Sequence, residues 1–466
     1  MMRAALILCT WASLAQAGSV SCGSSLCFAS GFGTGGVLQR APARAAVYGS
    51  APAPGCASLT LWLNASDGSS ARAYHGATAA DNTWKILLEP VATGGNYSLT
   101  IACVVTGQSV TISDQTFGDV WVCAGQSNEW LPLWFTEDRN LSTAAIAAGR
   151  YTNLRLWRGG LQRTATRGNW VLPAGPEPGS NPGEALTNQW RRPADLIPPN
   201  YIRDGEPWLW EFPSTCFYTA QYLTDLMIAR DGAAPPFGLL SVPVGGTMLE
   251  EWASPAAQAQ CRNVTCMCFD DKTGCNPYSD PAGPTCTGNT AMYAGSIEPF
   301  LNMTIKGWNW LQGENNLQFD PGNSRDGTGY ACLFPAMIAD WRASWSAQPN
   351  TTDALAPFVF ATIADGSDES FGITMARLRL AQTASYGVVP NAAMPATAQA
   401  LAHDKGDPWD ADSCGDRGCC VDPYIPLGPS CVGDHRGFWS VNATPWFQGC
   451  ECAAVAARSS PRRPAL

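Results

Sequence analysis

A serine hydroxyl lies between two side-chain amides in the stretch Gln126-Ser127-Asn128. This stretch follows residues 120–123, whose sequence Val-Trp-Val-Cys predicts a buried strand, and a turn at Gly125. A serine on the tight turn after a parallel strand is lifted out of the sheet, where it can act as a nucleophile. The Gly-x-Ser-x-Gly form of such an elbow is absent, and on these residues alone a helix cap at Ser127 is the favoured interpretation.

Two further predicted strands also end in small or polar residues. The run 236–244 leads into Gly245-Gly246-Thr247, and the run 303–311 leads into residues 312–316, with the sequence Gln-Gly-Glu-Asn-Asn. A glycine pair lets a backbone N–H approach a ligand closely, although alone it indicates only a tight turn. Ligands bind outside the carboxyl ends of the strands in an open α/β sheet, so we expect the three strand ends to converge.

Convergence of the three strand ends would build a site for ester hydrolysis. Ser127 would supply the nucleophile, and Gln126 beside it would contact the substrate. The N–H groups of Ser127 and Gly246, with a side-chain amide from Gln312 or Asn316, would hold the developing oxyanion. This chemistry requires no metal or organic cofactor, and no cluster of residues in the sequence demands one.

A general base is needed to activate the serine hydroxyl, and the sequence contains only three histidines. His75 lies in the β-rich first part of the chain, in a stretch that predicts a polar surface loop. His435 is the first candidate and His403 the second. If neither reaches Ser127, the protein would bind glycans without catalysis. The carboxylate that would support the base stays open among Asp404, Asp407, Asp422 and Asp434.

The composition limits the classes of partner. With 466 residues, a net charge of −10 and only 14% charged residues, the chain is a poor prospect for binding nucleic acid or anionic membranes. Its 45% hydrophobic residues predict a large core. Most of the 19 tryptophans belong in that core, while some are expected to line a groove for sugars or other flat ligands. The sequence does not indicate an oligomeric state.

Residues 1–17 have the pattern of a secretory signal, with Arg3, an apolar run over 4–14 and a small-residue cleavage site at 15–17. No later stretch has the ~20 apolar residues of a membrane-spanning helix. Removal of Cys9 leaves eighteen cysteines, and an even number in an oxidising compartment predicts disulfides. The cysteines over 261–286 have no nearby histidine, which favours disulfides over zinc.

The chain is therefore expected to be secreted or lysosomal. Seven Asn-x-Ser/Thr sites are predicted glycan acceptors: Asn64, Asn96, Asn140, Asn263, Asn302, Asn350 and Asn442.

The order of predicted elements divides the mature chain into unlike parts. Short strands punctuated by Gly, Pro, Asn and Asp over 18–117 predict a β-sandwich-like domain. From 118 to 452 strands alternate with helices, which predicts an α/β domain with a parallel sheet. Helices are expected over 215–230, from near Pro335, and over 371–386. The segment 158–213 is predicted to be an insertion that either covers the site or decorates the surface, and 453–466 a disordered tail.

Several motifs resemble those of the sialate O-acetylesterases, a branch of the SGNH hydrolases, over roughly residues 30–407. The resemblance is carried by residues 118–121 with 125–128, by 245–247 with Glu250 and Trp252, by 310–316, by 332–336 with 340–342, by 381–384 with 389–391, and by 37–40 with Trp84.

The resemblance implies a three-layer α/β/α domain joined to a β-rich domain, and removal of O-acetyl groups from sialic acids. It implies that Ser127 is the nucleophile and that Gly246 and residues 312–316 form the oxyanion hole. The chain departs from the family pattern at Glu129, where methionine is usual, at Asn315, where serine or threonine is usual, and in having no His-Pro. An acetylated plant or algal polysaccharide is the alternative substrate.

Overall fold

The structure is a computed structural model that describes most of the chain between residues 25 and 402. The described ranges are 25–52, 54–136, 138–159, 162–163, 170–171, 188–199, 202–203, 206–261, 290–317, 327–364 and 373–402.

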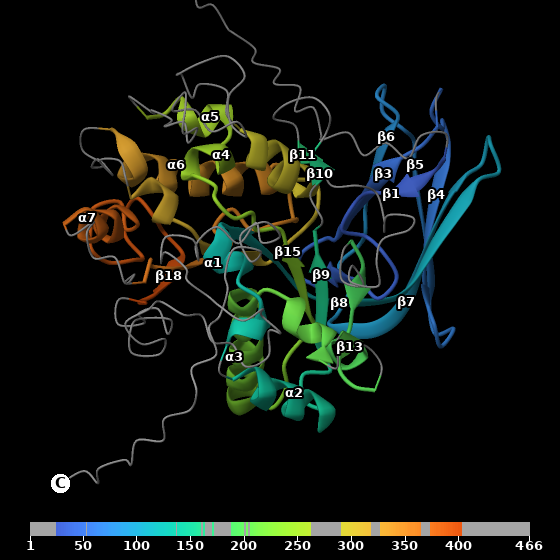
Figure 1. Cartoon of the computed structure of the whole chain (residues 1–466). Helices are drawn as coiled ribbons and strands as arrows, with labels where there is room; N and C mark the ends of the chain where they lie inside the picture. The colour runs from blue at the N-terminus through green and yellow to red at the C-terminus, as the bar shows by residue number, and fades with distance from the viewer. Residues whose placement is uncertain are drawn as a thin grey trace, which may run out of the picture.

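The first part of the described chain is built of strands, most of which the sequence predicts (Figure 1). They are β1 (Cys27–Phe28), β2 (Val37–Gln39), β3 (Ala46–Ser50), β4 (Leu59–Ala65), β5 (Ala71–Gly76), β6 (Thr83–Leu87), β7 (Gly94–Cys103) and β8 (Ser109–Gly125). Strands β1, β3 and β6 form one sheet, while β5, β4, β7 and β8 pair side by side in another. The predicted loop around His75 is wrong, because this residue lies on β5, paired with Thr60 and exposed to solvent.

Strand β8 joins this region to the main sheet without interruption. Its first half pairs with β7 and β2, and its second half pairs in parallel with β15 (Phe237–Ser241) and β16 (Gly307–Leu311). The predicted domain boundary between 117 and 118 therefore falls inside one strand. The side chain of Arg40 reinforces the junction, since its Nε donates to Asp119 Oδ1 over 2.8 Å.

The fold is mixed α/β with one large sheet, in agreement with the coarse prediction. Its strand order is β12-β9-β15-β8-β16-β17-β18, in which all neighbours are parallel except the antiparallel pair of β12 and β9. The remaining strands of this path are β9 (Leu154–Arg158), β12 (Trp190–Arg191), β17 (Phe358–Ala361) and β18 (Thr397–Ala400). Two short antiparallel pairs complete the described strands, each made of two-residue strands. One pairs β10 (Gln162–Arg163) with β11 (Trp170–Val171), and the other pairs β13 (Ile202–Arg203) with β14 (Glu206–Pro207).

Helices cover both faces of the parallel strands (Figure 1). Alternate residues of β8 face opposite ways: Val122 packs in the core that contains α6 (Gly329–Trp345), and Trp121 packs in the core that contains α3 (Ser214–Asp231). The other helices are α1 (Ser127–Trp130), α2 (Arg139–Ala147), α4 (Leu249–Trp252), α5 (Pro255–Gln258) and α7 (Ile373–Ala381), with short turns η1 (Leu133–Phe135), η3 (Pro193–Leu196), η4 (Trp208–Glu211), η5 (Tyr293–Ile297), η6 (Glu298–Phe300) and η7 (Glu314–Asn316).

Helix α6 corrects one expectation. It begins at Gly329, not near Pro335, and the proline lies inside it. The preceding turn contributes the buried side chains of Tyr330, Leu333 and Phe334 to the core. Burial of this apolar surface holds the first turns in helical form and outweighs the one internal hydrogen bond that Pro335, with no N–H, cannot make.

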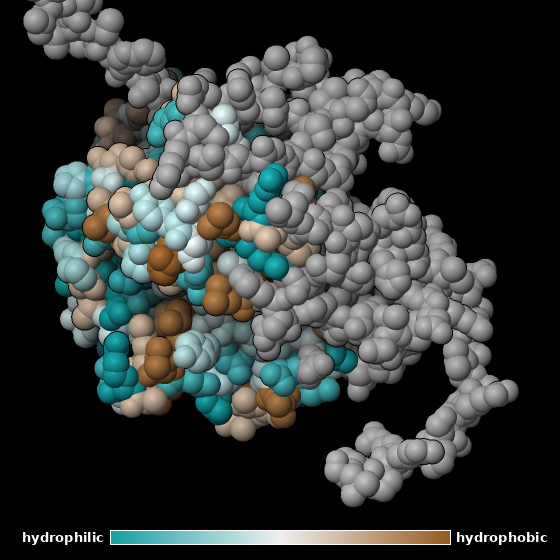
Figure 2. All heavy atoms as spheres, turned by 90° about the vertical axis from the view of Figure 1, so that its left-hand side faces the viewer, coloured by the Kyte–Doolittle hydropathy of each residue, from teal (hydrophilic) through white to brown (hydrophobic). Residues whose placement is uncertain are grey.

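Three disulfides with described partners link distant segments. They are Cys56–Cys103, Cys123–Cys216 and Cys261–Cys332. Bridging of Cys261 agrees with the preference for disulfides over zinc, while the other cysteines of that cluster lie outside the described residues. Within the described ranges, no helix combines the length and apolar character needed to cross a bilayer. The face toward α7 and β18 mixes hydrophilic residues with separate hydrophobic spots (Figure 2).

Candidate active site

Ser127 lies where β8 ends and the short helix α1 begins. Gly125 makes the turn with a φ of +141°, and a Cβ at this position would lie 2.1 Å from the carbonyl oxygen of Leu311. Only glycine fits there. The next residue, Gln126, donates its backbone N–H to the same carbonyl over 2.9 Å. The turn thus fixes Ser127 at the carboxyl end of the central strand.

The three strand ends lie together in the structure. A Cβ built on Gly245 would be 3.4 Å from Ser127 Cβ, so the loop after β15 packs directly on the serine. A Cβ built on Gly246 would be 3.9 Å from Asn315 Nδ2, which places the loop after β16 beside the same glycine pair. Gly246 has a φ of +75°, in the left-handed region that favours glycine.

The side chain of Gln312 connects the three loops. Its Nε2 lies 3.1 Å from Gln126 Oε1, 3.1 Å from the carbonyl oxygen of Thr247 and 2.7 Å from Asn316 Oδ1. An amide nitrogen has two hydrogens, and here three acceptors compete for them. The NH₂ group of Gln312 is therefore fully used inside the protein.

The amide of Asn316 is also used internally. Its Oδ1 accepts from the backbone N–H of Leu249 over 3.0 Å, and its Nδ2 donates to Glu250 Oε2 over 2.9 Å. By contrast, the backbone N–H groups of Ser127 and Gly246 have no hydrogen-bond partner among the described residues. These two backbone N–H groups are available to donate to a ligand.

Three buried carboxyl groups surround the serine turn. Burial raises the pKa of Glu129 well above its ordinary value, and it also raises the pKa of Glu250 and Glu314. Hydrogen bonds from Asn316 to Glu250 and from Asn128 to Glu314 oppose the shift in part. Burial thus favours the neutral form of all three groups. The upward shifts in pKa lessen the repulsion that three carboxylates would exert on negative charge developing at Ser127.

Glu129 lies against the disulfide beneath the serine turn. One carboxylate oxygen of Glu129 and the sulfurs of Cys123 and Cys216 lie within 4.8 Å of one another. Because the two sulfurs are bonded to each other, this group is not a set of metal ligands. Neither oxygen of Glu129 has a hydrogen-bond partner among the described residues.

The candidates for the general base lie outside the described residues. This holds for His435 and His403 and for the aspartates weighed as their support: Asp404, Asp407, Asp422 and Asp434. Ser127 is buried, with 2% of its surface exposed. Its Oγ has no hydrogen-bond partner in the part of the chain that the structure describes.

Sequence reasoning assigned no supporting role to Gln382, Thr247 and Trp252, which organise the site from behind. Gln382 in the turn after α7 donates its Nε2 to the backbone carbonyl of Gln312 over 3.1 Å and accepts from the N–H of Ile363 over 3.2 Å. Thr247 accepts from the indole N–H of Trp252 over 2.9 Å. The signals in the sequence were the place of Thr247 at a strand end and the family-like motif that contains Gln382.

Comparisons with known proteins agree with this architecture. The sialate O-acetylesterase of Homo sapiens is 29% identical over 394 residues, which cover 83% of this chain and 66% of that protein. The Mus musculus sialate O-acetylesterase is 27% identical over 416 residues, covering 84% of this chain and 70% of that protein. The resemblance to the sialate O-acetylesterases is confirmed. The chain spans just under two thirds of the length of its human relative.

A solved structure also resembles the fold. A carbohydrate acetylesterase from Xanthomonas citri superposes with a TM-score of 0.56 at 23% identity, over 82% of this chain and 69% of that one. No family model matches the sequence. The likeness to the sialate O-acetylesterases therefore rests on pairwise similarity along the chain.

Proposed function

We propose that this protein is a carbohydrate O-acetylesterase that removes O-acetyl groups from sialic acids through an acyl-enzyme on Ser127. The observation that carries the proposal is the packing of Ser127 against Gly245, with the N–H groups of Ser127 and Gly246 lacking described partners. Similarity to sialate O-acetylesterases over most of the chain supports the same activity.

The reaction would begin when Ser127 Oγ attacks the acetyl carbonyl carbon while its proton passes to an imidazole. The N–H groups of Ser127 and Gly246 would donate to the oxyanion that forms. When the intermediate collapses, the sugar oxygen takes the proton and leaves, and the acetyl group stays on Ser127. A water molecule, deprotonated by the same imidazole, then releases acetate and restores the serine.

The neighbouring amides would act as positioning groups. Gln312 would fix the positions of the loops that contain Gln126 and Thr247 by donating to both. Asn316 would fix the start of α4 by accepting from the N–H of Leu249. This refines the expectation that Gln312 or Asn316 donates to the oxyanion, since both NH₂ groups have internal acceptors. Asn315 Nδ2, beside Gly246, is the side-chain amide best placed to serve as a third donor.

His435 is our candidate for the base, with His403 second. Replacing the base should lower the rate of acetate release by about 10²–10⁴-fold, whereas replacing the other histidine should leave it unchanged. Comparing His435→Ala with His403→Ala therefore assigns the role. Equal rates for both variants and the unaltered protein would exclude both residues.

We also propose an SGNH-type architecture and a secretory-pathway location for the protein. Helices on both faces of the parallel strands fit an SGNH-type three-layer domain, and the two β-sheets before it fit a sandwich-like domain. Bridged cysteines and a signal-like start fit a secreted or lysosomal protein.

Acetate release from O-acetylated sialic acid tests the proposal, with acetylated polysaccharides as parallel substrates. We expect Ser127→Ala to abolish release. The matched control is Ser241→Ala, because Ser241 is also buried with an Oγ that lacks a described partner but lies within β15. Preference for a polysaccharide would keep the chemistry and change the substrate. No release from any acetylated sugar by folded protein would contradict the proposal and favour a glycan-binding protein.

A further inference from the structure

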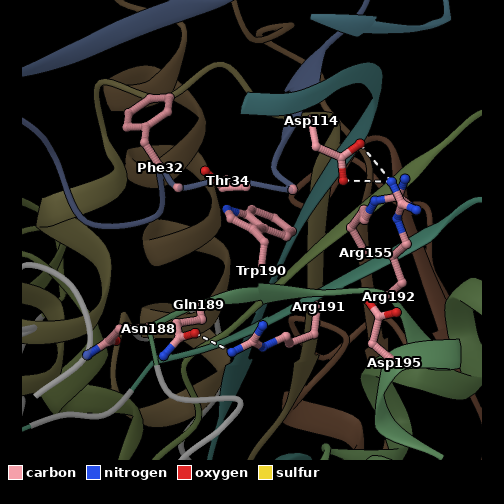
Figure 3. A pocket seen from close by; sticks show the side chains of 12 residues that line it. Phe32, Thr34, Asp114, Arg155, Asn188, Gln189, Trp190, Arg191, Arg192 and Asp195 are labelled. Atoms are coloured by element: carbon pink, nitrogen blue, oxygen red, sulfur yellow. Dashed lines mark hydrogen bonds and ion pairs between the residues drawn. The ribbon is translucent and has the colours of Figure 1, made fainter. Parts of the chain in front are cut away.

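A cavity lies on the edge of the main sheet, away from Ser127. It has a volume of about 540 Å³ and is walled by residues of four segments: the loop 32–35, Asp114 of β8, Arg155 of β9, and residues within 188–195 (Figure 3). This volume is within the range of ~300–1,000 Å³ that is usual for small-molecule sites.

Arg155, on β9, is the unusual residue of this cavity wall. Only 9% of its surface is exposed, and it has no described carboxylate partner. Its Nη1 donates to the backbone carbonyls of Thr152 and Leu154 over 3.0 and 3.1 Å. Its Nε is buried without a hydrogen-bond partner among the described residues, and its Nη2, which is not among the buried unpaired atoms, is the donor left for a ligand. A buried guanidinium with an unused donor is costly unless an anion completes it.

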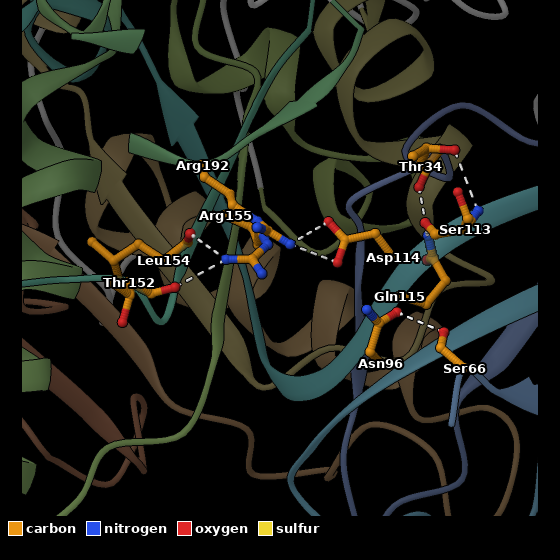
Figure 4. A network of polar contacts seen from close by, with 11 residues as sticks. Thr34, Ser66, Asn96, Ser113, Asp114, Gln115, Thr152, Leu154, Arg155 and Arg192 are labelled. Carbon is orange, nitrogen blue, oxygen red and sulfur yellow. Dashed lines mark hydrogen bonds and ion pairs between the residues drawn. The ribbon is translucent and has the colours of Figure 1, made fainter. Parts of the chain in front are cut away.

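The other charged side chains of the wall balance one another, so the net positive charge of the cavity is that of Arg155. Arg192 forms an ion pair with Asp114, whose two oxygens lie 2.7 and 2.6 Å from Arg192 Nη2 (Figure 4). Burial lowers the pKa of Arg155, and the neighbouring charge of Arg192 lowers it further, against the opposite effect of Asp114 and Asp195. With Arg191, the cavity wall has three arginines and two aspartates, in a chain of net charge −10.

The rest of the wall offers neutral hydrogen-bonding groups and an aromatic ring. Asn188, Gln189 and Thr34 contribute amides and a hydroxyl, and Phe32 contributes the ring (Figure 3). The loop over 33–36 is fixed against β8, since Gln115 Nε2 donates to the carbonyl of Gly33 over 2.7 Å. A bare inorganic anion would need the arginine but neither the amides nor the volume.

We infer that this cavity binds an acidic sugar, with the sugar carboxylate on Arg155 and the hydroxyls on the neutral groups of the wall. Arg155 is level with Val120 in the sheet register, and β8 continues five residues, roughly 17 Å, before it ends at Gly125. The cavity is therefore a binding site separate from Ser127. The inference does not depend on the proposed hydrolysis.

Calorimetric titration of the whole mature protein tests this inference. The probes are N-acetylneuraminic acid and glucuronic acid as acidic sugars, N-acetylglucosamine as a neutral sugar, and inorganic phosphate, all at one ionic strength. We expect saturable binding of the acidic sugars only. Arg155→Gln should weaken it about tenfold or more, because a charge-assisted hydrogen bond is lost.

A second variant, expected to tighten binding, keeps the test valid if Arg155→Gln fails to fold. Asp114→Asn should tighten acidic-sugar binding several-fold, because it removes a negative charge and releases Arg192. Its matched control is Asp225→Asn, which breaks a similarly exposed ion pair with Arg150 and should leave binding unchanged. Hydrolysis of 4-nitrophenyl acetate should be the same in these variants as in the unaltered protein. Loss of this hydrolysis would concern the proposed catalysis at Ser127, whereas loss of sugar binding alone would concern the cavity.

Equal binding of the neutral sugar, tighter binding of phosphate, or absence of binding would each overturn the inference. Acidic-sugar affinity that is the same in Arg155→Gln, Asp114→Asn and the unaltered protein would overturn it as well.

Discussion

Gln312 Nε2 lies 3.1 Å from Gln126 Oε1, which ties together two strand ends that are 186 residues apart in sequence. The same nitrogen reaches the carbonyl oxygen of Thr247 in the third loop. Because all three residues are buried, the tie holds the turn around Ser127 without exposing a polar group to solvent. The geometry of the serine turn therefore depends on a residue of another strand.

Replacing Gln312 by alanine should destabilise the fold and slow catalysis together. The change leaves the buried acceptors at 126, 247 and 316 short of a donor, which should lower the free energy of unfolding by about 1–3 kcal/mol. Denaturant unfolding and acetate release check this. An oxyanion donor would behave differently: loss of kcat by about 10²–10³-fold with unchanged stability would show that Gln312 faces the substrate.

Gly246→Ala should lower kcat with little change in KM. A side chain strains a backbone of φ +75°, and the N–H proposed to meet the oxyanion would move. We expect a loss of about 10²–10³-fold. The matched control is Gly232→Ala at the end of α3, where φ is +77° and a Cβ meets no atom within 4 Å. If both variants retained full activity, the oxyanion role of Gly246 would be wrong.

Glu129→Met should stabilise the protein at alkaline pH. The pKa of Glu129 is raised in the folded state, so the folded protein holds its proton more tightly than the unfolded chain. This tighter proton binding contributes fully to the free energy of unfolding below the unfolded pKa of about 4.3. The contribution is lost as pH rises toward the folded pKa. The advantage of methionine should grow by about 1.4 kcal/mol per pH unit over this window.

Denaturant unfolding of Glu129→Met at pH 5 and pH 8 measures this difference. Glu89→Gln is the control, because Glu89 is an exposed partner of Arg44. A stability difference that is the same at both pH values would show that Glu129 is charged in the fold.

Loss of the Cys123–Cys216 disulfide should affect both stability and activity. The bond joins β8 to α3 across 93 residues, and its sulfurs lie beside Glu129 under the serine turn. Changing both cysteines to alanine should lower the free energy of unfolding by about 2–5 kcal/mol and slow acetate release. Removing Cys56–Cys103 in the β-rich region should cost similar stability and leave the rate of the folded protein unchanged. Equal effects of the two changes on this rate would argue against support of the serine turn.

Local patterns predicted much of the fold. The apolar run 236–244 and the helix predicted over 215–230 match β15 and α3 closely, because strand and helix periodicity are local properties. Pro335 misled the prediction of α6, since tertiary burial of the preceding turn outweighed a local signal. The continuity of β8 across the boundary predicted at 117 could not be read from the sequence. One strand pairs with β7 in its first half and with β16 in its second, and strand pairing is a property of the folded chain.

The candidate site was predictable only in part. Polar residues after three strands indicated a shared edge because parallel strands end on one side of a sheet. The saturation of Gln312 could not be read from sequence, since its acceptors come from three separate loops. The lone guanidinium of Arg155 was hidden too, because burial and the absence of a partner are properties of the folded chain.

The central claim is that Ser127 forms a covalent acyl-enzyme. Reaction of the mature protein with an alkyl fluorophosphonate, followed by peptide mass spectrometry, tests it most directly, because such reagents trap activated serines. The account predicts one adduct per chain, on Ser127, that is prevented by Ser127→Ala and accompanies loss of acetate release. An adduct on another serine, or full acetate release from Ser127→Ala, would contradict it.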